Sequence, residues 1–198
     1  MKGRLGRLSS RLYFICVPFL VFLPLPHGTN IPLRRKPVVT IALVWINIAI
    51  FLGMFLSGRE NFKAFLDQWG YVAADNRILT LFTYQFLHGG FSHLFGNMLF
   101  LWIFGANVED RLGRLGFLAF YLACGVAAIL FFVHVGGLEL STEPCAGASG
   151  SIYGVIGAFF VLFPLAEIRV TFVIMILVFY WRIRTFWVAA FFIAPLFI

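Results

Sequence analysis

Residues 38–57 read VVTIALVWINIAIFLGMFLS and contain no charged side chain. Because an α-helix rises about 1.5 Å per residue, a run of this length covers a hydrocarbon core of about 30 Å. The stretch therefore predicts a transmembrane helix. The whole chain points the same way: 62% of its 198 residues are hydrophobic and 12% are charged, and the mean hydropathy is +0.96. In a soluble domain about a quarter of the residues are charged.

Further apolar runs predict an all-α polytopic membrane protein. The spans that we expect after the first cover residues 91–107, 115–135 and 149–164. Residues 58–82 are mixed and amphipathic. An apolar stretch at 170–180 suits a re-entrant or interfacial segment. A last run begins near Thr185 and is too short to cross a bilayer before Ile198.

The net charge of +7 is concentrated toward the N-terminus. The basic residues that precede the first full span are Lys2, Arg4, Arg7, Arg11, Arg34, Arg35 and Lys36. A basic cluster can indicate nucleic-acid binding, but beside a membrane span it is more typical of a cytoplasmic flank facing anionic lipid. We therefore expect no nucleic-acid partner. The same rule predicts a cytoplasmic N-terminus and places loops 58–82 and 136–148 outside.

The chain divides into a basic, interfacial N-terminal segment, residues 1–30, and a membrane domain, residues 31–198. Within the first, residues 12–25 are apolar but interrupted by prolines. This favours an interfacial segment or an uncertain start codon over a cleaved signal peptide. The three cysteines are scattered and give neither a disulfide framework nor a metal spacing. The absence of an HExxH pattern argues against a zinc protease, and we expect no metal or cofactor.

The stretch Gly147-Ala148-Ser149-Gly150 stands where a loop becomes a helix. The start of a helix presents free N–H groups and the positive end of its dipole. A nucleophilic Ser149 would therefore sit beside donors for an oxyanion. The alternative is that Ser149 only caps the helix and that the glycines only permit close packing.

His93 and Asn97 share one face of the second span because they are four residues apart. The predicted topology brings His93 to the same depth as Ser149, at the outer ends of their spans. Polar residues inside a bilayer usually face a protein interior or a water cavity. The alternative role for this pair is hydrogen bonding that merely joins helices.

Glycines and aromatic residues predict how the fourth span packs. Gly150 and Gly154 have the small-residue spacing that brings helix backbones together. Tyr153 lies one turn after Ser149 and would point into the same cavity. These features predict that the fourth span is central.

A second repeat of small residues frames a carboxylate. Gly105, Glu109 and Gly113 recur every four residues. We interpret Glu109 as a helix-end or loop anchor that Arg111 and Arg114 are near enough to pair with. His88, one or two turns before His93 and Asn97, could support a loop.

Taken together, three motifs resemble those of the rhomboid intramembrane serine proteases. They are HGGFSHLFGN at residues 88–97, GANVEDRLG at 105–113 and GASGSIYG at 147–154. The order and spacing of the motifs also fit that family. The resemblance covers about residues 31–198.

The resemblance implies a rhomboid-like bundle of six helices around a water-filled site, of which this chain would supply about five. Ser149 would be the nucleophile. His93, Asn97 and the Ser149 backbone N–H would hold the oxyanion, flanked by Gly147 and Gly150. Tyr153 would pack against the catalytic base. Substrates would be transmembrane segments of other membrane proteins, and the enzyme would be a multi-pass protein. The short loops and minimal core suit a bacterial or archaeal plasma membrane.

Two departures from the family pattern leave alternatives open. The family's base is a histidine on the sixth helix, and this sequence stops before it; His134 is the residue that could substitute by depth. Many relatives carry a Trp-Arg pair where this chain reads Leu79-Thr80, which puts local loop anchoring in doubt. We therefore expect a protease whose chain is truncated before its sixth helix. The alternatives are a catalytically inactive relative that binds transmembrane helices and an unrelated transporter, against which the lack of an ionisable residue at mid-span argues.

Overall fold

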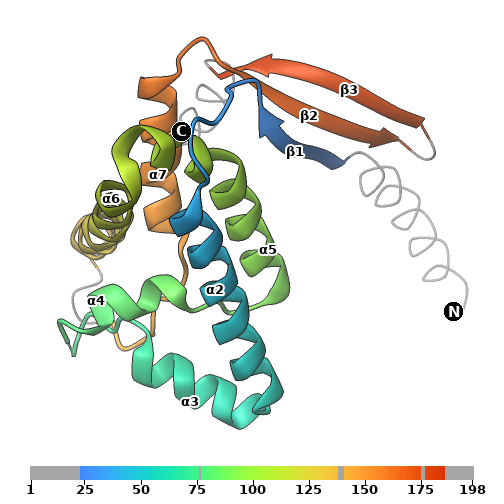
Figure 1. Cartoon of the computed structure of the whole chain (residues 1–198). Helices are drawn as coiled ribbons and strands as arrows, with labels where there is room; N and C mark the ends of the chain where they lie inside the picture. Colours follow the sequence, from blue (N-terminus) through green and yellow to red (C-terminus); the bar gives the residue numbers. More distant parts are fainter. Residues whose placement is uncertain (1–22, 76, 138–140, 175–176, 186–198) are drawn as a thin grey trace, which may run out of the picture. The chain divides into compact units, whose positions relative to one another are not determined.

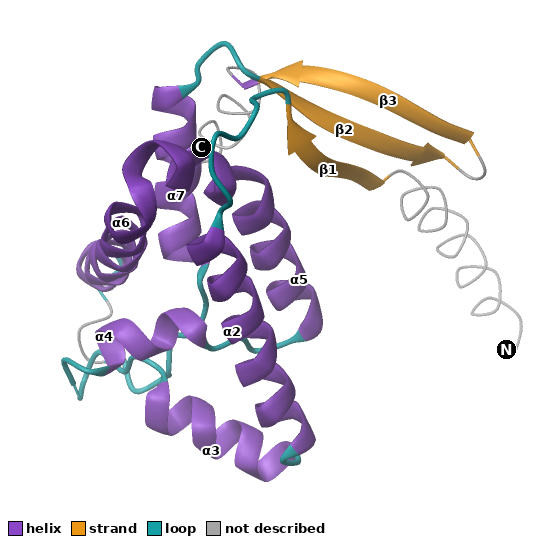
Figure 2. Cartoon of the chain, in the orientation of Figure 1, coloured by secondary structure: helices purple, strands orange, loops and turns teal. Residues whose placement is uncertain are grey.

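The computed structural model describes residues 23–75, 77–137, 141–174 and 177–185 (Figure 1). They fall into two compact units. One is the segment Ile31–Pro164, and the other comprises the described residues up to Asn30 and from Leu165 onward. The first unit is helical, and the second contains the strands (Figure 2).

Helix α2, Val38–Leu56, follows Pro37, a residue whose fixed φ and missing N–H are tolerated at a helix start. Its residues are apolar on all sides. Leu43 and Phe51 are buried against other helices, whereas Trp45 is 64% and Leu56 80% exposed. An apolar helix with a large exposed apolar surface belongs in lipid rather than in water. The predicted span at residues 38–57 is confirmed as a helix long and apolar enough to cross a membrane.

The connection that follows consists of short helices and tight turns. It contains α3 (Arg59–Trp69), α4 (Thr80–Thr83) and the 3-10 turn η1 (Tyr84–Phe86). Helix α3 is amphipathic and buries none of its residues completely.

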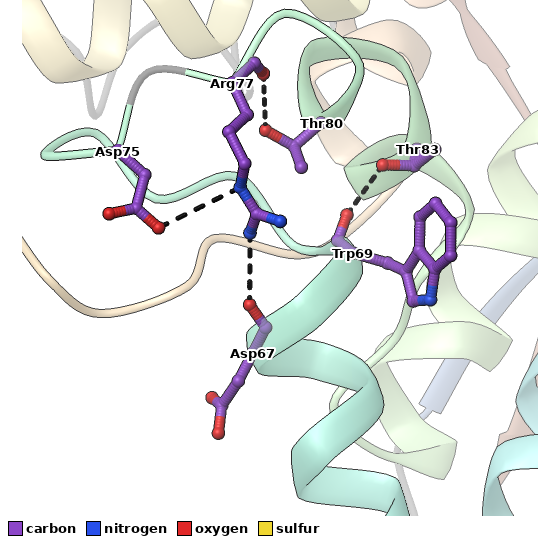
Figure 3. Close-up of polar contacts among 6 residues, drawn as sticks. All are labelled: Asp67, Trp69, Asp75, Arg77, Thr80 and Thr83. Atoms are coloured by element: carbon purple, nitrogen blue, oxygen red, sulfur yellow. Dashed lines mark hydrogen bonds and ion pairs between the residues drawn. The ribbon is translucent and has the colours of Figure 1, made fainter.

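Threonine hydroxyls and Arg77 hold this connection together (Figure 3). Thr83 Oγ1 donates to the Trp69 carbonyl over 2.7 Å, and Thr80 Oγ1 donates to the Arg77 carbonyl over 2.7 Å. The Arg77 guanidinium lies 3.9 Å from the Asp75 carboxylate and donates to the Asp67 carbonyl over 3.4 Å. The connection is therefore anchored by contacts of its own, although Leu79-Thr80 had put this anchoring in doubt.

The second and third predicted spans form one long run of helical hydrogen bonds with a break. The run consists of α5 (Phe91–Phe100), the π-helical turn η2 (Leu101–Gly105) and α6 (Ala106–Val135). Gly113, with φ 73° and ψ 166°, interrupts it. A positive φ is accessible to glycine at little cost, so this residue separates the two spans.

Helix α7, Ser149–Leu162, is the fourth predicted span and lies against α6. Contacts at glycines bring the two backbones together. A Cβ on Gly150 would lie 2.6 Å from the Ala128 Cβ, and a Cβ on Gly154 would overlap the Cys124 side chain. The other side of α7 packs Phe159 edge-on against Phe104, with ring centroids 4.9 Å apart. Helix α7 thus has close neighbours on both sides.

The second unit contains a three-stranded antiparallel sheet in the order β1-β2-β3. Its strands are β1 (Leu23–Thr29), β2 (Glu167–Ile174) and β3 (Leu177–Arg184). The pairing runs from Leu23 opposite Val173 to Thr29 opposite Ile168, with a bulge between Pro26 and Gly28.

The sheet differs from the interfacial or re-entrant segments expected at residues 12–25 and 170–180. Pro24 and Pro26 are compatible with β1 because it is an edge strand. Residues 167–184 are rich in β-branched and aromatic side chains, which favour strands. Residues 12–22 and most of the final apolar run lie outside the described residues.

Candidate active site

Ser149 is the first residue of α7, and the histidine of the second span lies next to it. Gly147 marks the point of contact: a Cβ built on it would lie 2.7 Å from the His93 Cε1 and 3.6 Å from the Ser149 Oγ. Gly147 has a φ of 142° and is buried, whereas Ser149 is half-buried and His93 is exposed. Only a residue without a side chain fits this position, so Gly147 allows the serine and the imidazole to face the same space.

The start of α7 also supplies hydrogen-bond donors. Ala148 precedes the helix without a side-chain cap, and its carbonyl accepts from the Ile152 N–H in the first turn. The N–H groups of Ser149 and Gly150 are therefore among the first-turn donors that a helix leaves unpaired. In the described part of the chain the Ser149 hydroxyl has no hydrogen-bond partner. The arrangement can present a nucleophilic oxygen beside N–H donors.

His88 and Asn97 form a buried pair behind His93. The Asn97 Nδ2 lies 3.0 Å from the His88 Nε2, and the ring centroids of His88 and His93 are 5.3 Å apart in an edge-on arrangement. An amide nitrogen can only donate, so the His88 Nε2 accepts and its Nδ1 carries the proton. We expected His88 to support a loop; the structure joins it to Asn97. One amide hydrogen of Asn97 is thereby used, and the other remains for a second acceptor.

Backbone hydrogen bonds between three pairs of residues hold the segment that leads into Ser149. The Tyr71 and Cys145 backbones exchange two hydrogen bonds of 3.0 and 2.8 Å, and the Gly147 N–H donates to the Tyr84 carbonyl over 2.9 Å. Nearer the start of the segment, the Ala74 N–H donates to the Ser141 carbonyl over 3.1 Å. The connection between α3 and α5 therefore fixes the position of the serine.

A polar cluster that the motifs did not predict joins the first turn of α7 to the connection before α5. Ser151 Oγ donates to the Gln85 Oε1 over 2.9 Å, and the Gln85 amide donates to the Leu81 carbonyl. The Tyr84 hydroxyl donates to the Gly125 carbonyl over 2.7 Å. Ser151 and Gln85 are fully buried. The signal that could have revealed them is polar side chains in otherwise apolar segments.

Glu109 anchors the start of α2. Its carboxylate accepts hydrogen bonds from the Val39 N–H, the Thr40 N–H and the Thr40 hydroxyl over 2.9, 2.7 and 2.8 Å. A carboxylate is stabilising at the positive end of a helix dipole. Gly105 faces the same threonine, because a Cβ on it would lie 3.0 Å from the Thr40 Cγ2. Arg111 does not pair with Glu109 as expected; its guanidinium lies 5.0 Å above the Phe163 ring.

Two further candidates from the sequence are exposed side chains. Tyr153 is 61% exposed, and His134 is an exposed residue in the last turn of α6. Within the described ranges, no group of three or more His, Cys, Asp or Glu residues could hold a metal ion.

The fold and site together define a class of protein: a bundle of apolar membrane helices with a serine at the start of a central, glycine-lined helix. Comparison with known proteins then identifies the family. Residues 75–197 match the family model of the Rhomboid domain. The chain belongs to the rhomboid family, whose members are generally intramembrane serine proteases.

Individual relatives come from mitochondria and from bacteria. The chain is 36% identical over 165 residues to Rhomboid protein 1, mitochondrial, of Saccharomyces cerevisiae. The matched region covers 81% of this chain and 46% of that protein. It is 33% identical over 127 residues to Rhomboid protease GluP of Bacillus subtilis, covering 62% of this chain and 24% of that protein. The Putative rhomboid protease YdcA of Bacillus subtilis is 29% identical over 142 residues, or 66% of each chain. The chain thus spans less than half the length of the first two relatives.

Proposed function

We propose that the protein is an intramembrane serine endopeptidase that cleaves transmembrane segments of other membrane proteins, with Ser149 as its nucleophile. The observation that carries this proposal is the meeting of Ser149 and His93 around Gly147 at the start of α7. Peptide hydrolysis needs a nucleophile, donors for the oxyanion and access for water. Ser149 is half-buried and His93 exposed, so both can reach a substrate.

In this proposal the His93 ring and the first N–H groups of α7 stabilise the developing oxyanion. The second amide hydrogen of Asn97 joins them, while His88 fixes the amide through its first. A serine is a weak nucleophile until a base takes its proton. The family resemblance implies that this base is a histidine on a further helix, which would pack near the exposed Tyr153.

A second candidate is a rhomboid-like protein that binds transmembrane helices without cutting them. It is favoured by one observation: within the described residues the Ser149 hydroxyl is hydrogen-bonded to no base. Such a protein would use the same membrane bundle but would not depend on the serine oxygen.

Labelling with a fluorophosphonate probe separates the two functions. The protein, expressed from its natural coding sequence and purified in detergent, is compared with Ser149→Ala and with Ser92→Ala. Ser92 is an exposed serine beside His93 and serves as the matched control. The protease predicts labelling that Ser149→Ala abolishes and Ser92→Ala retains, together with cleavage of a transmembrane reporter that follows the same pattern. A folded protein that neither labels nor cleaves would reject the protease and favour the helix-binding candidate.

A further inference from the structure

A pocket of about 550 Å³ lies where the start of α2 meets the break at Gly113. This volume is in the range of sites that hold small molecules, about 300–1,000 Å³. The pocket is at the far end of the helical unit from Ser149. Arg111, two residues before Gly113, covers Phe163 beyond the last turn of α7, and the 14 residues of α7 separate the two ends by about 20 Å.

Three basic side chains line the pocket: Arg35, Lys36 and Arg114. All three are exposed, and in the described part of the chain none is paired with a carboxylate. The two carboxylates of the pocket already accept hydrogen bonds from backbone N–H groups. Asp110 accepts from the backbone N–H groups of Arg34 and Arg35 over 3.2 and 2.9 Å, and Glu109 accepts from the start of α2. The basic heads therefore remain available to an anion.

Apolar side chains line the pocket beside the charged ones. Leu112 and Leu115 line it and are 43% and 84% exposed. Gly113 between them leaves space, because a Cβ there would meet nothing within 4 Å. These leucines flank the Gly113 break in the run Phe91–Val135, which is long and apolar enough to cross a membrane. A ligand that uses the whole surface must combine an anionic group with hydrocarbon.

We propose that this pocket binds an anionic phospholipid, whose phosphate contacts Arg35, Lys36 and Arg114 and whose acyl chain lies along Leu112 and Leu115. Basic pockets at the ends of transmembrane helices attract acidic head groups. A free phosphate ion would satisfy the three cations but would leave the exposed leucines unused. The lipid would join the start of α2 to the start of the third span, on the side of the membrane away from Ser149.

The test is a lipid titration of the whole protein in detergent, followed by native mass spectrometry. Phosphatidylglycerol, phosphatidylcholine with the same acyl chains and soluble sn-glycerol 3-phosphate are the three ligands. The pocket variant is Arg35→Gln/Arg114→Gln. The matched control is Arg59→Gln/Lys63→Gln, which removes two charges from the exposed helix α3.

We expect phosphatidylglycerol to bind more tightly than phosphatidylcholine and the pocket variant to lose about 25-fold in affinity, since each basic residue contributes roughly fivefold. The α3 control should change binding less than twofold. An equal loss in both variants would indicate general surface attraction and overturn the proposal. Binding of glycerol 3-phosphate as tight as that of the lipid would assign a soluble phosphate ligand and overturn it as well.

Folding of the variants is checked by size-exclusion chromatography and by melting temperature. If the double variant does not fold, Lys36→Gln replaces it, because this side chain is exposed and forms no ion pair within the described residues. The proposal then requires a loss of about fivefold. Unchanged affinity in that variant contradicts it.

Discussion

The Asn97 amide donates a hydrogen bond of 3.0 Å to the imidazole of His88, and both side chains are buried. His88 precedes α5 and lies outside the helices that are long and apolar enough to cross a membrane. Burial, with a smaller contribution from His93, lowers its pKa from 6.5 to about 4. His88 is therefore neutral in the folded protein at neutral pH, as its role as an acceptor requires.

The lowered pKa of His88 predicts that the protein loses stability in mild acid. The unfolded chain takes up this proton near pH 6.5, whereas the folded protein does so only near pH 4. The shifted pKa of His88 therefore contributes up to about 3 kcal/mol to the free energy of unfolding. This contribution is complete above pH 6.5 and is lost as the pH falls toward 4. Thermal unfolding in detergent between pH 4 and pH 8 measures it.

His88→Gln provides the comparison for this prediction because it keeps an acceptor for Asn97 and cannot titrate. Its unfolding temperature should depend less on pH than that of the wild type. His134→Gln, which removes an exposed histidine, should follow the wild-type profile. Parallel profiles for the wild type and His88→Gln would show that another group causes the pH dependence.

Gly147→Ala should impair the site without unfolding the bundle. The new Cβ would lie 2.7 Å from the His93 Cε1 and would need a φ of 142°, which side chains rarely adopt. Both effects displace the imidazole or the serine, and a shift of about 1 Å in a catalytic group can cost about 100-fold in rate. We expect a loss of that order in fluorophosphonate labelling of Ser149.

The control for Gly147→Ala is Gly58→Ala. Gly58 also has a positive φ, 92°, but a Cβ there would meet nothing within 4 Å. This variant carries the backbone strain without the contact, and it should label like the wild type. If both variants lose labelling to the same extent, strain alone explains the effect and the contact with His93 does not matter.

The bond between Ser151 and Gln85 should contribute to stability rather than to chemistry. Ser151→Ala removes the donor and leaves the fully buried Gln85 Oε1 unsatisfied, which costs about 1–3 kcal/mol. Gln85→Met in the same chain removes the orphaned oxygen. A double-mutant cycle, measured by unfolding, should give a coupling energy of about 1–2 kcal/mol. Additive effects would show that the hydrogen bond contributes little.

The helices could be predicted from the sequence because lipid removes most of the ambiguity. A long run without charge, such as residues 38–57, has no other stable arrangement in a bilayer. Ser149 was identified because a helix start has local signals, whereas the break at Gly113 was not predicted from its spacing to Gly105 and Glu109. The proximity of His93 to Ser149 then followed from the direction of the spans.

The side-chain pairs could not be predicted in the same way. Asn97 can bond to several partners, and its choice of His88 depends on the path of residues 87–90 between η1 and α5. Gln85 and Ser151 are 66 residues apart in the sequence, so no local pattern joins them. The strands were missed because a short apolar run such as residues 170–180 fits a strand or an interfacial helix equally well, and β1 and β2 come from opposite ends of the chain.

Glu109→Gln should destabilise the fold more than the matching change at Asp110. The buried carboxylate accepts three hydrogen bonds from Val39 and Thr40 at the start of α2. A neutral amide has one oxygen in place of two, and its NH₂ group would face N–H donors. The loss of charge-assisted bonds at a helix start should cost about 2–3 kcal/mol, seen as a lower melting temperature in detergent.

Asp110→Asn is the control for this prediction. Its carboxylate also accepts backbone N–H bonds, but at exposed positions, so a loss of about 1 kcal/mol or less is expected. Equal losses in the two variants would mean that burial of Glu109 adds nothing to its role as an anchor.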